Sequence, residues 1–115
     1  MDIALKRAYE PPARGDGARI LVDRLWPRGV KKDALRLDLW LKDIAPSPAL
    51  RTWFDHVPER FDEFATRYRR ELRANPAAVA TLEAFLRKGR TTLVYATRDP
   101  VMNSAAVLRD WLLAR

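Results

Sequence analysis

The alternation of apolar and polar residues along the chain predicts four β-strands. Residues 3–8 and 19–23 form short, mostly apolar runs, and residues 91–97 have an apolar centre. Residues 35–41 alternate strictly between leucine and another residue, which predicts a strand with four leucines on one face. We expect the last two of these segments to lie in the same sheet.

Apolar residues at helical spacing predict four helices. Ser47 and Asn75 are each followed by proline, the pattern of an N-cap with proline at the first helical position. Pro58 opens a further helix between these two. The last helix begins at Asp99 or one turn later and ends near Leu113. This order of elements predicts an α/β fold, with a small, mostly parallel sheet of about four strands flanked by helices.

The composition is that of one globular domain, residues 1–115. Apolar residues make up 48% and charged residues 32% of the chain, which is ordinary for a soluble protein. Cysteine is absent, which excludes disulfides and thiolate metal sites. No apolar run approaches the roughly 18 residues of a membrane span, and the N-terminus lacks the layout of a signal peptide. We therefore expect a cytoplasmic protein with no membrane partner.

The formal net charge of +7 indicates an anionic partner. Of the 22 basic residues 17 are arginine, and they are spread along the chain with no run longer than two. That spread favours a generally basic, solvated surface over a specific anionic partner. A small anionic ligand, a nucleic acid and a surface without a specific partner all stay open, as does the oligomeric state.

Two strands end in unusually polar loops, at residues 23–29 and 95–104. In open α/β sheets, ligands bind beyond the carboxyl ends of the strands, and a helix N-terminus favours an anion. Guanidinium groups suit phosphate or carboxylate, and a neighbouring aspartate orients them or accepts a ligand hydroxyl. The candidate catalytic residues are Asp23, Asp99 and His56. The candidate ligand-binding residues are Arg24, Trp26, Arg28, Gly29, Lys42, Arg98 and Asn103.

A chemical property makes each of the uncharged candidates, and Lys42, suitable for a role in the site. Gly29 lets the backbone approach a ligand closely, and Trp26 offers a face for a base or sugar. His56, the only histidine, fits a general acid or base but also the end of a helix. Lys42 follows the third strand and adds positive charge, and Asn103 either caps the last helix or points into the cleft.

Structural roles account for the same loops. Asp23–Arg24 and Arg98–Asp99 are also typical of structural ion pairs, Asp99 is typical of an N-cap, and Trp26 fits a plug at the edge of the core. The two interpretations differ in geometry. A binding site requires both loops to face one shared cleft, whereas the structural interpretation predicts two separate ion pairs.

Several enzyme classes are excluded by missing motifs. The chain has no glycine-rich phosphate loop with Lys-Ser/Thr, no G-x-S-x-G elbow and no H-E-x-x-H. A magnesium site made of Asp23 and Asp99 alone has little support. We therefore predict no metal site, and the sequence identifies no cofactor.

Four segments resemble a known family. "RILVDRLWPRGV", "WLKDIAPSPALRTWFDH", "FATRYRREL" and "TTLVYATRDPVMNSAAVL" are similar, in order and over nearly the whole chain, to the YeaO-like family of bacterial proteins, a domain of unknown function numbered 488. The resemblance implies a compact α/β domain and a bacterial cytoplasmic setting, and it implies no activity. Thr97 departs from the small apolar residue expected at its position.

The leading hypothesis is a polar cleft that binds a small anionic ligand, phosphate-bearing or nucleotide-like, with hydrolase or transferase chemistry as an open extension. Arg24, Arg28 and Arg98 would hold the anion, and Asp23 or Asp99 would be the acid–base group. The alternatives are a nucleic-acid-binding accessory protein that uses its arginine-rich surface, and a structural or partner-binding module.

Overall fold

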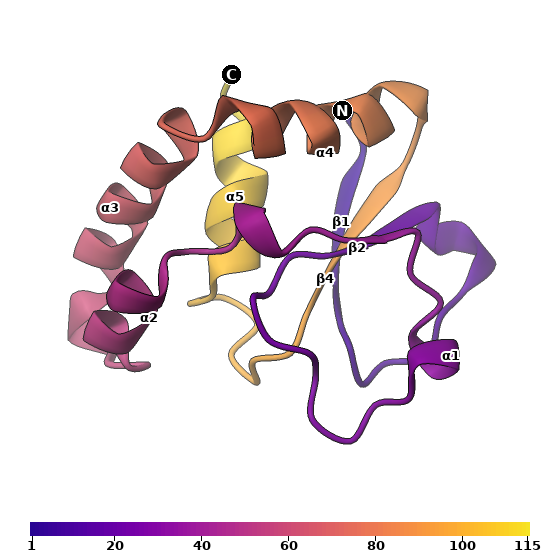
Figure 1. Cartoon of the computed structure of the whole chain (residues 1–115), viewed down its shortest axis with the longest axis horizontal. Helices are drawn as coiled ribbons and strands as arrows, with labels where there is room; N and C mark the ends of the chain where they lie inside the picture. The colour runs from indigo at the N-terminus through magenta and orange to yellow at the C-terminus, as the bar shows by residue number, and fades with distance from the viewer.

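Four parallel strands form one sheet in the computed structural model, which describes residues 1–115 (Figure 1). The strands are β1 (Ile3–Arg7), β2 (Ala18–Leu21), β3 (Leu39–Trp40) and β4 (Thr91–Tyr95), in the spatial order β1-β4-β2-β3. In the centre of the sheet, Leu93 lies opposite Leu5 on one side and Ile20 on the other. Because every pair is parallel, all carboxyl ends meet at one edge, and the predicted α/β class is confirmed.

The helices are α1 (Lys32–Leu35), α2 (Pro48–Phe54), α3 (Phe61–Arg73), α4 (Pro76–Lys88) and α5 (Ser104–Leu113). Short 3-10 turns occur at Arg14–Asp16, Lys42–Ile44 and Pro58–Arg60. Ser47 caps α2 as predicted, since its Oγ accepts a hydrogen bond from the N–H of Leu50 at 3.2 Å. None of these helices combines the length and the apolar character needed to cross a membrane.

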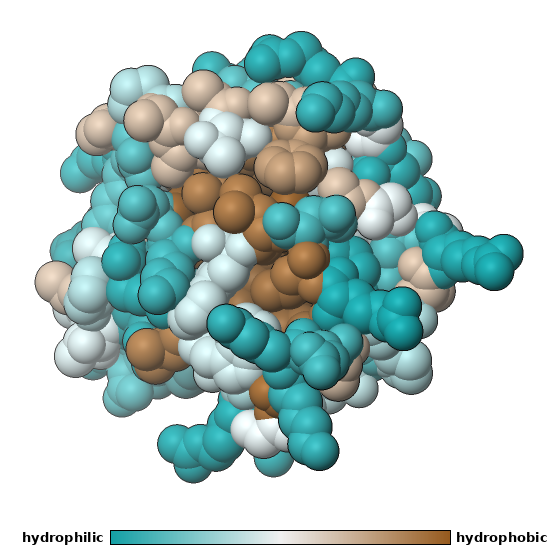
Figure 2. Space-filling view, turned by 45° about the vertical axis from the view of Figure 1, so that its right-hand side comes forward, coloured by the Kyte–Doolittle hydropathy of each residue, from teal (hydrophilic) through white to brown (hydrophobic).

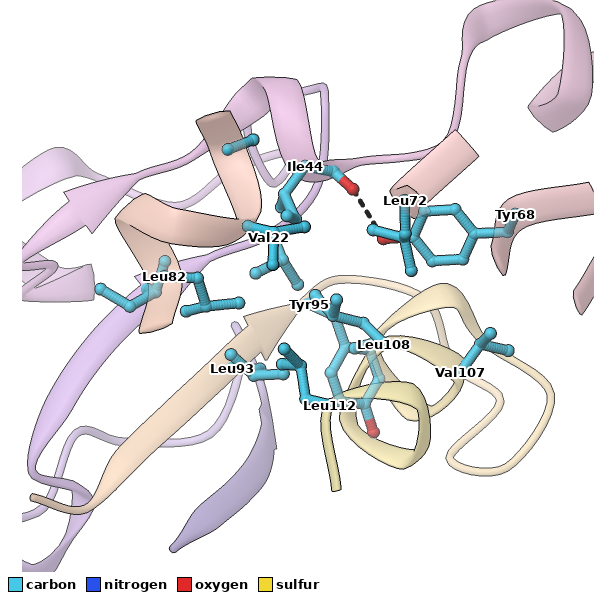
Figure 3. Packing of buried hydrophobic residues seen from close by; sticks show 14 of the residues in the cluster. Val22, Ile44, Tyr68, Leu72, Leu82, Leu93, Tyr95, Val107, Leu108 and Leu112 are labelled. Atoms are coloured by element: carbon cyan, nitrogen blue, oxygen red, sulfur yellow. Dashed lines mark hydrogen bonds between the residues drawn. The ribbon is translucent and has the colours of Figure 1, made fainter. Parts of the chain in front are cut away.

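The main core lies between one face of the sheet and helices α2 to α5 (Figure 3). Leu93 from β4 meets Leu108 and Leu112 from α5, all almost completely buried. From α3, Tyr68 reaches across this core and donates a 2.6 Å hydrogen bond to the carbonyl of Ile44, drawn dashed in Figure 3. Burial raises the pKa of Tyr68, so this phenol is a permanent donor that ties α3 to the segment before α2.

A second, smaller core covers the opposite face of the sheet. It contains Ala8, Leu21, Leu35 and Val94, with Trp26, Val30, Leu37 and Trp40 packed against them. Helix α1 and irregular chain between β2 and β3 cover this part of the face, so the loop after β2 is itself part of the protein interior. Polar side chains dominate the surface in Figure 2, where apolar ones gather in a central hollow.

The predicted strand at residues 35–41 is wrong in extent and in side-chain placement. Only residues 39–40 are β-strand, and Leu35 ends α1. Arg36 adopts a left-handed conformation with φ 48°, which interrupts the alternation. Leu35 and Leu37 therefore join the second core, while Leu39 and Leu41 pack against the main core, instead of sharing one face.

The other half of the second face is polar. Asp16 is 8% exposed and accepts two hydrogen bonds from basic side chains. Lys6 Nζ donates to its Oδ1 at 3.0 Å, and Arg19 Nη1 donates to its Oδ2 at 2.6 Å. Arg19 is 4% exposed and also donates from Nε to the carbonyl of Leu35 at 3.0 Å. This buried charge network fixes the loop before β2 against the sheet.

Candidate functional site

A cleft of about 1020 Å³ lies at the carboxyl edge of the sheet. The ends of β1, β2 and β4, helix α2 and the start of α5 all contribute to its walls. In Figure 1 the loops after β2 and β4 both lie along the lower edge of the view. Eight of the ten candidates line this cleft: Asp23, Arg24, Trp26, Arg28, His56, Arg98, Asp99 and Asn103.

The remaining two candidates, Gly29 and Lys42, lie outside the cleft. Gly29 adopts a positive φ of 78°, so it serves the turn of its loop and does not bring backbone to a ligand. Lys42 Nζ lies 4.1 Å from the centroid of the Trp40 ring, a cation–π contact that directs its charge elsewhere. Their proposed binding roles are not supported by their positions.

Asp23 joins the ends of the two central strands. It follows β2, and its Oδ2 accepts a 2.9 Å hydrogen bond from the N–H of Ala96, just after β4. Oδ1 accepts no hydrogen bond from the protein and is not completely buried, and Asp23 is one of the residues that line the cleft. Burial raises the pKa of Asp23, against the opposing effects of the Ala96 hydrogen bond and the charge of Arg51.

Asp99 and Asn103 organise the backbone of the loop after β4. Asp99 Oδ1 accepts from the N–H groups of Val101 and Met102, both at 2.9 Å, and these hydrogen bonds hold its pKa below the ordinary value. Asn103 Oδ1 accepts from the N–H of Ala106 at 2.8 Å, which makes it the N-cap of α5, and its Nδ2 donates to the Asp99 carbonyl. Asp99 is therefore an anion in a turn and, contrary to the expectation from the sequence, not the N-cap of α5, and Asn103 has its polar side-chain atoms occupied.

The two structural ion pairs, Asp23–Arg24 and Arg98–Asp99, do not form. No guanidinium nitrogen of either arginine lies within 4.0 Å of a carboxylate oxygen. Arg24 instead makes long hydrogen bonds, 3.4 and 3.5 Å, to two consecutive carbonyls before α2.

Arg7, at the end of β1, braces the cleft in the same manner. Its Nε and Nη2 donate to the two carbonyls directly after β4, at 3.0 and 3.2 Å. Its guanidinium also lies 5.0 Å from the ring centroid of Tyr9, whose hydroxyl donates to the carbonyl of Arg28 at 3.0 Å. Arg7 thus connects the loop after β4 with the loop after β2.

Three arginines remain free at the cleft. Arg28, Arg51 and Arg98 are exposed, come from three separate segments, and donate no side-chain hydrogen bond to the protein. Five arginines and two aspartates line the cleft in all, so the lining carries a net charge of +3 with His56 neutral. This excess of unpaired guanidinium makes the cleft attractive to an anion.

Apolar side chains form the rest of the lining. Leu25 is 57% exposed, and Met102 is partly exposed. Trp26 is half-buried, and its Nε1 donates to the carbonyl of Val30 at 2.7 Å, so the ring belongs chiefly to the second core. His56 is exposed, with φ 54°, just after the end of α2. It fits the end of a helix better than a general base, because no side chain orients it.

Arg7 and Arg51 are the charged cleft residues that were not among the candidates chosen from the sequence. Arg7 follows the same rule as the selected loops, because it ends a strand of the parallel sheet, so that rule applied to β1 finds it. Arg51 lies within α2, and only the packing of that helix brings it to the strand ends.

No cluster of three or more His, Cys, Asp or Glu side chains with metal-binding geometry is present.

Comparison with known proteins identifies the family. An uncharacterized protein of Mycobacterium tuberculosis is 47% identical over 113 residues, covering 98% of this chain and 95% of its own. The uncharacterized protein YeaO of Escherichia coli is 43% identical over 112 residues, covering 97% of each chain. No solved structure matches the chain. A family model described as the inactive DUF488-N3 subclade matches residues 2–115, and the chain belongs to this family.

Proposed function

We propose that the cleft binds a small, phosphate-bearing anion and does so without converting it. The observation that carries the proposal is the set of three free guanidiniums, Arg28, Arg51 and Arg98, on separate segments around one cleft. A planar guanidinium pairs with two oxygens of a phosphate group, so three of them arranged around a cleft suit a tetrahedral oxyanion. The cleft volume of about 1020 Å³ is at the upper end of that of ordinary small-molecule sites.

Binding without turnover fits the chemistry of the lining. Asp99 is held as an anion by two backbone hydrogen bonds, and Asn103 is occupied as a cap. His56 has no orienting partner, which leaves Asp23 as the one adjustable acid or base. The lining shows no nucleophile hydrogen-bonded to a base, the arrangement that is typical of covalent hydrolase and transferase sites. The description of the family as inactive supports the same choice.

The first experiment is calorimetric titration with inorganic phosphate, pyrophosphate and adenosine monophosphate. Arg28→Gln, Arg51→Gln and Arg98→Gln should each weaken binding about tenfold, because each removes a charged hydrogen-bond donor. Arg87→Gln is the matched control, since Arg87 is exposed on α4 and lies outside the cleft. If none of the three probes binds at millimolar concentration, the proposal is wrong.

The same variants separate this proposal from nucleic-acid binding. A nucleic acid held by the diffuse basic surface would lose affinity steeply with salt, with a log–log slope of about −0.9 per phosphate neutralised on duplex DNA. Its affinity would also fall equally in Arg87→Gln and in Arg51→Gln. Binding that depends on the cleft arginines and spares Arg87→Gln instead supports the small ligand.

A further inference from the structure

Asp23 poses a question that anion binding does not answer. A carboxylate that faces an anion repels it, and this repulsion is stronger at the lower effective dielectric constant of a protein cleft than in water. The hydrogen bond that Asp23 accepts from the Ala96 N–H does not require a charge, because an asparagine oxygen would also accept it. A cleft meant only for an anion gains nothing from this carboxylate.

The free oxygen of Asp23 supplies the explanation. Oδ2 accepts the hydrogen bond from Ala96, while Oδ1 has no partner in the protein, and Asp23 lines the cleft. An ionised carboxylate oxygen is an acceptor only, so its ligand partner must be a donor such as a hydroxyl. In α/β domains that bind nucleotides, an acidic residue beside the phosphate site accepts hydrogen bonds from the sugar hydroxyls.

The neighbouring walls suit the remainder of such a ligand. Leu25 and Met102 line the same cleft, and both are at least partly exposed. They offer apolar contact for the carbon skeleton of a sugar, beside the charged groups of Arg51 and Arg98. Guanidinium groups for a phosphate, a carboxylate acceptor and apolar side chains thus occur together in one cleft.

On the basis of the proposed function, we infer that the ligand is a sugar phosphate, free or as part of a nucleotide, and that Asp23 Oδ1 accepts a hydrogen bond from a sugar hydroxyl. The free arginines then hold the phosphate, and Asp23 distinguishes a hydroxylated ligand from a plain phosphate ester. Asp23 is a specificity residue in this arrangement.

The test compares ribose 5-phosphate with n-pentyl phosphate, which has the same phosphate and five carbons but no hydroxyl. The wild-type protein should bind ribose 5-phosphate about tenfold more tightly, the effect of one hydrogen bond to a charged group. Asp23→Asn keeps an acceptor for the Ala96 N–H but replaces the free carboxylate oxygen with an amide NH₂. Its preference for the sugar should fall to about twofold or less.

Asp99→Asn is the matched control. It removes one negative charge from the same cleft, and its amide oxygen can still accept from Val101 and Met102. Both variants should bind n-pentyl phosphate somewhat more tightly, because each removes a repulsive charge. Only Asp23→Asn should lose the preference for ribose 5-phosphate.

Each outcome has one meaning. Equal binding of the two esters by the wild-type protein overturns the inference and leaves phosphate binding intact. An equal loss of preference in Asp99→Asn also overturns it, because the effect then follows charge and not a hydroxyl contact. Absence of binding for both esters refutes the proposed function itself. A wild-type preference that survives in Asp23→Asn also overturns the inference, because the hydroxyl contact then belongs to another residue.

Discussion

The indole of Trp26 meets the indole of Trp40 edge to face, with ring centroids 5.3 Å apart and planes at 67°. Each indole N–H donates to a backbone carbonyl at 2.7 Å, from Trp26 to Val30 and from Trp40 to Asp23. The pair therefore packs the second face of the sheet and holds both the start and the end of the loop after β2. The contact between the two indoles therefore positions the loop after β2, which forms part of the cleft wall.

Trp26→Ala should destabilise the protein by about 3 kcal/mol, toward the lower end for loss of a large aromatic because the ring is only half-buried. Leu25→Ala, at the exposed neighbouring position, should change the free energy of unfolding by no more than about 0.5 kcal/mol. Urea denaturation measures both. Equal effects of the two substitutions would show that Trp26 is not part of the core.

Asp23→Asn should stabilise the protein at neutral pH, by about 0.5–2 kcal/mol. Burial raises the pKa of Asp23 above its ordinary value of 3.8, so folding disfavours its ionised form. The contribution of Asp23 to the stability of the wild-type protein is therefore most favourable below pH 3.8. This contribution is lost as the pH rises through the raised pKa. Denaturation curves between pH 3 and 8 should converge for wild type and variant at the acidic end. A variant less stable than wild type at pH 7 would contradict this prediction.

Asp16→Asn should have the opposite effect, a loss of about 3–5 kcal/mol, because it leaves Arg19 and Lys6 without their carboxylate. Burial raises the pKa of Asp16, but its hydrogen bonds outweigh burial and the net shift is downward. Its stabilising contribution is present above pH 3.8 and is lost as the pH falls through the lowered pKa. Asp2→Asn, which breaks an exposed pair with Arg90, should change stability by less than about 1 kcal/mol and serves as the control.

Gly17→Ala should be strongly destabilising, whereas Gly15→Ala should be nearly neutral. Gly17 has φ 65°, and a Cβ there would collide with the carbonyl of Arg90. The backbone strain alone is about 1–3 kcal/mol. A Cβ at Gly15 meets nothing within 4 Å. Thermal melts of the two variants should therefore separate by several degrees, and similar melting temperatures would argue against this approach of the chain to β4.

Local patterns predicted the elements that depend on local physics. The proline-marked starts of α2 and α4 and the apolar centre of β4 are all found. The leucine alternation misled because Arg36 turns the chain and Asp38 pairs with Arg19 through both backbone and side chain, so the segment crosses between two cores. Periodicity within seven residues contains no information about such a crossing.

The position of the cleft could be predicted in part, from a general rule of parallel sheets. The rule that parallel strands end at one edge located both polar loops and brought Asp23 and Arg98 to one cleft. The partners of individual side chains could not be predicted, because they are backbone groups placed by the fold. Arg24 binds carbonyls in place of its neighbour Asp23, and Asp99 binds amides in place of Arg98.

The brace that Arg7 forms across the ends of β1 and β4 has a kinetic consequence. With both of its donor bonds made to the carbonyls after β4, the wall of the cleft is already in place in the free protein. A ligand then does not need to order the start of the loop after β4 when it arrives, which removes one entropic cost of association. Capture should proceed in a single bimolecular phase, its rate constant falling as salt screens the positive field of the cleft.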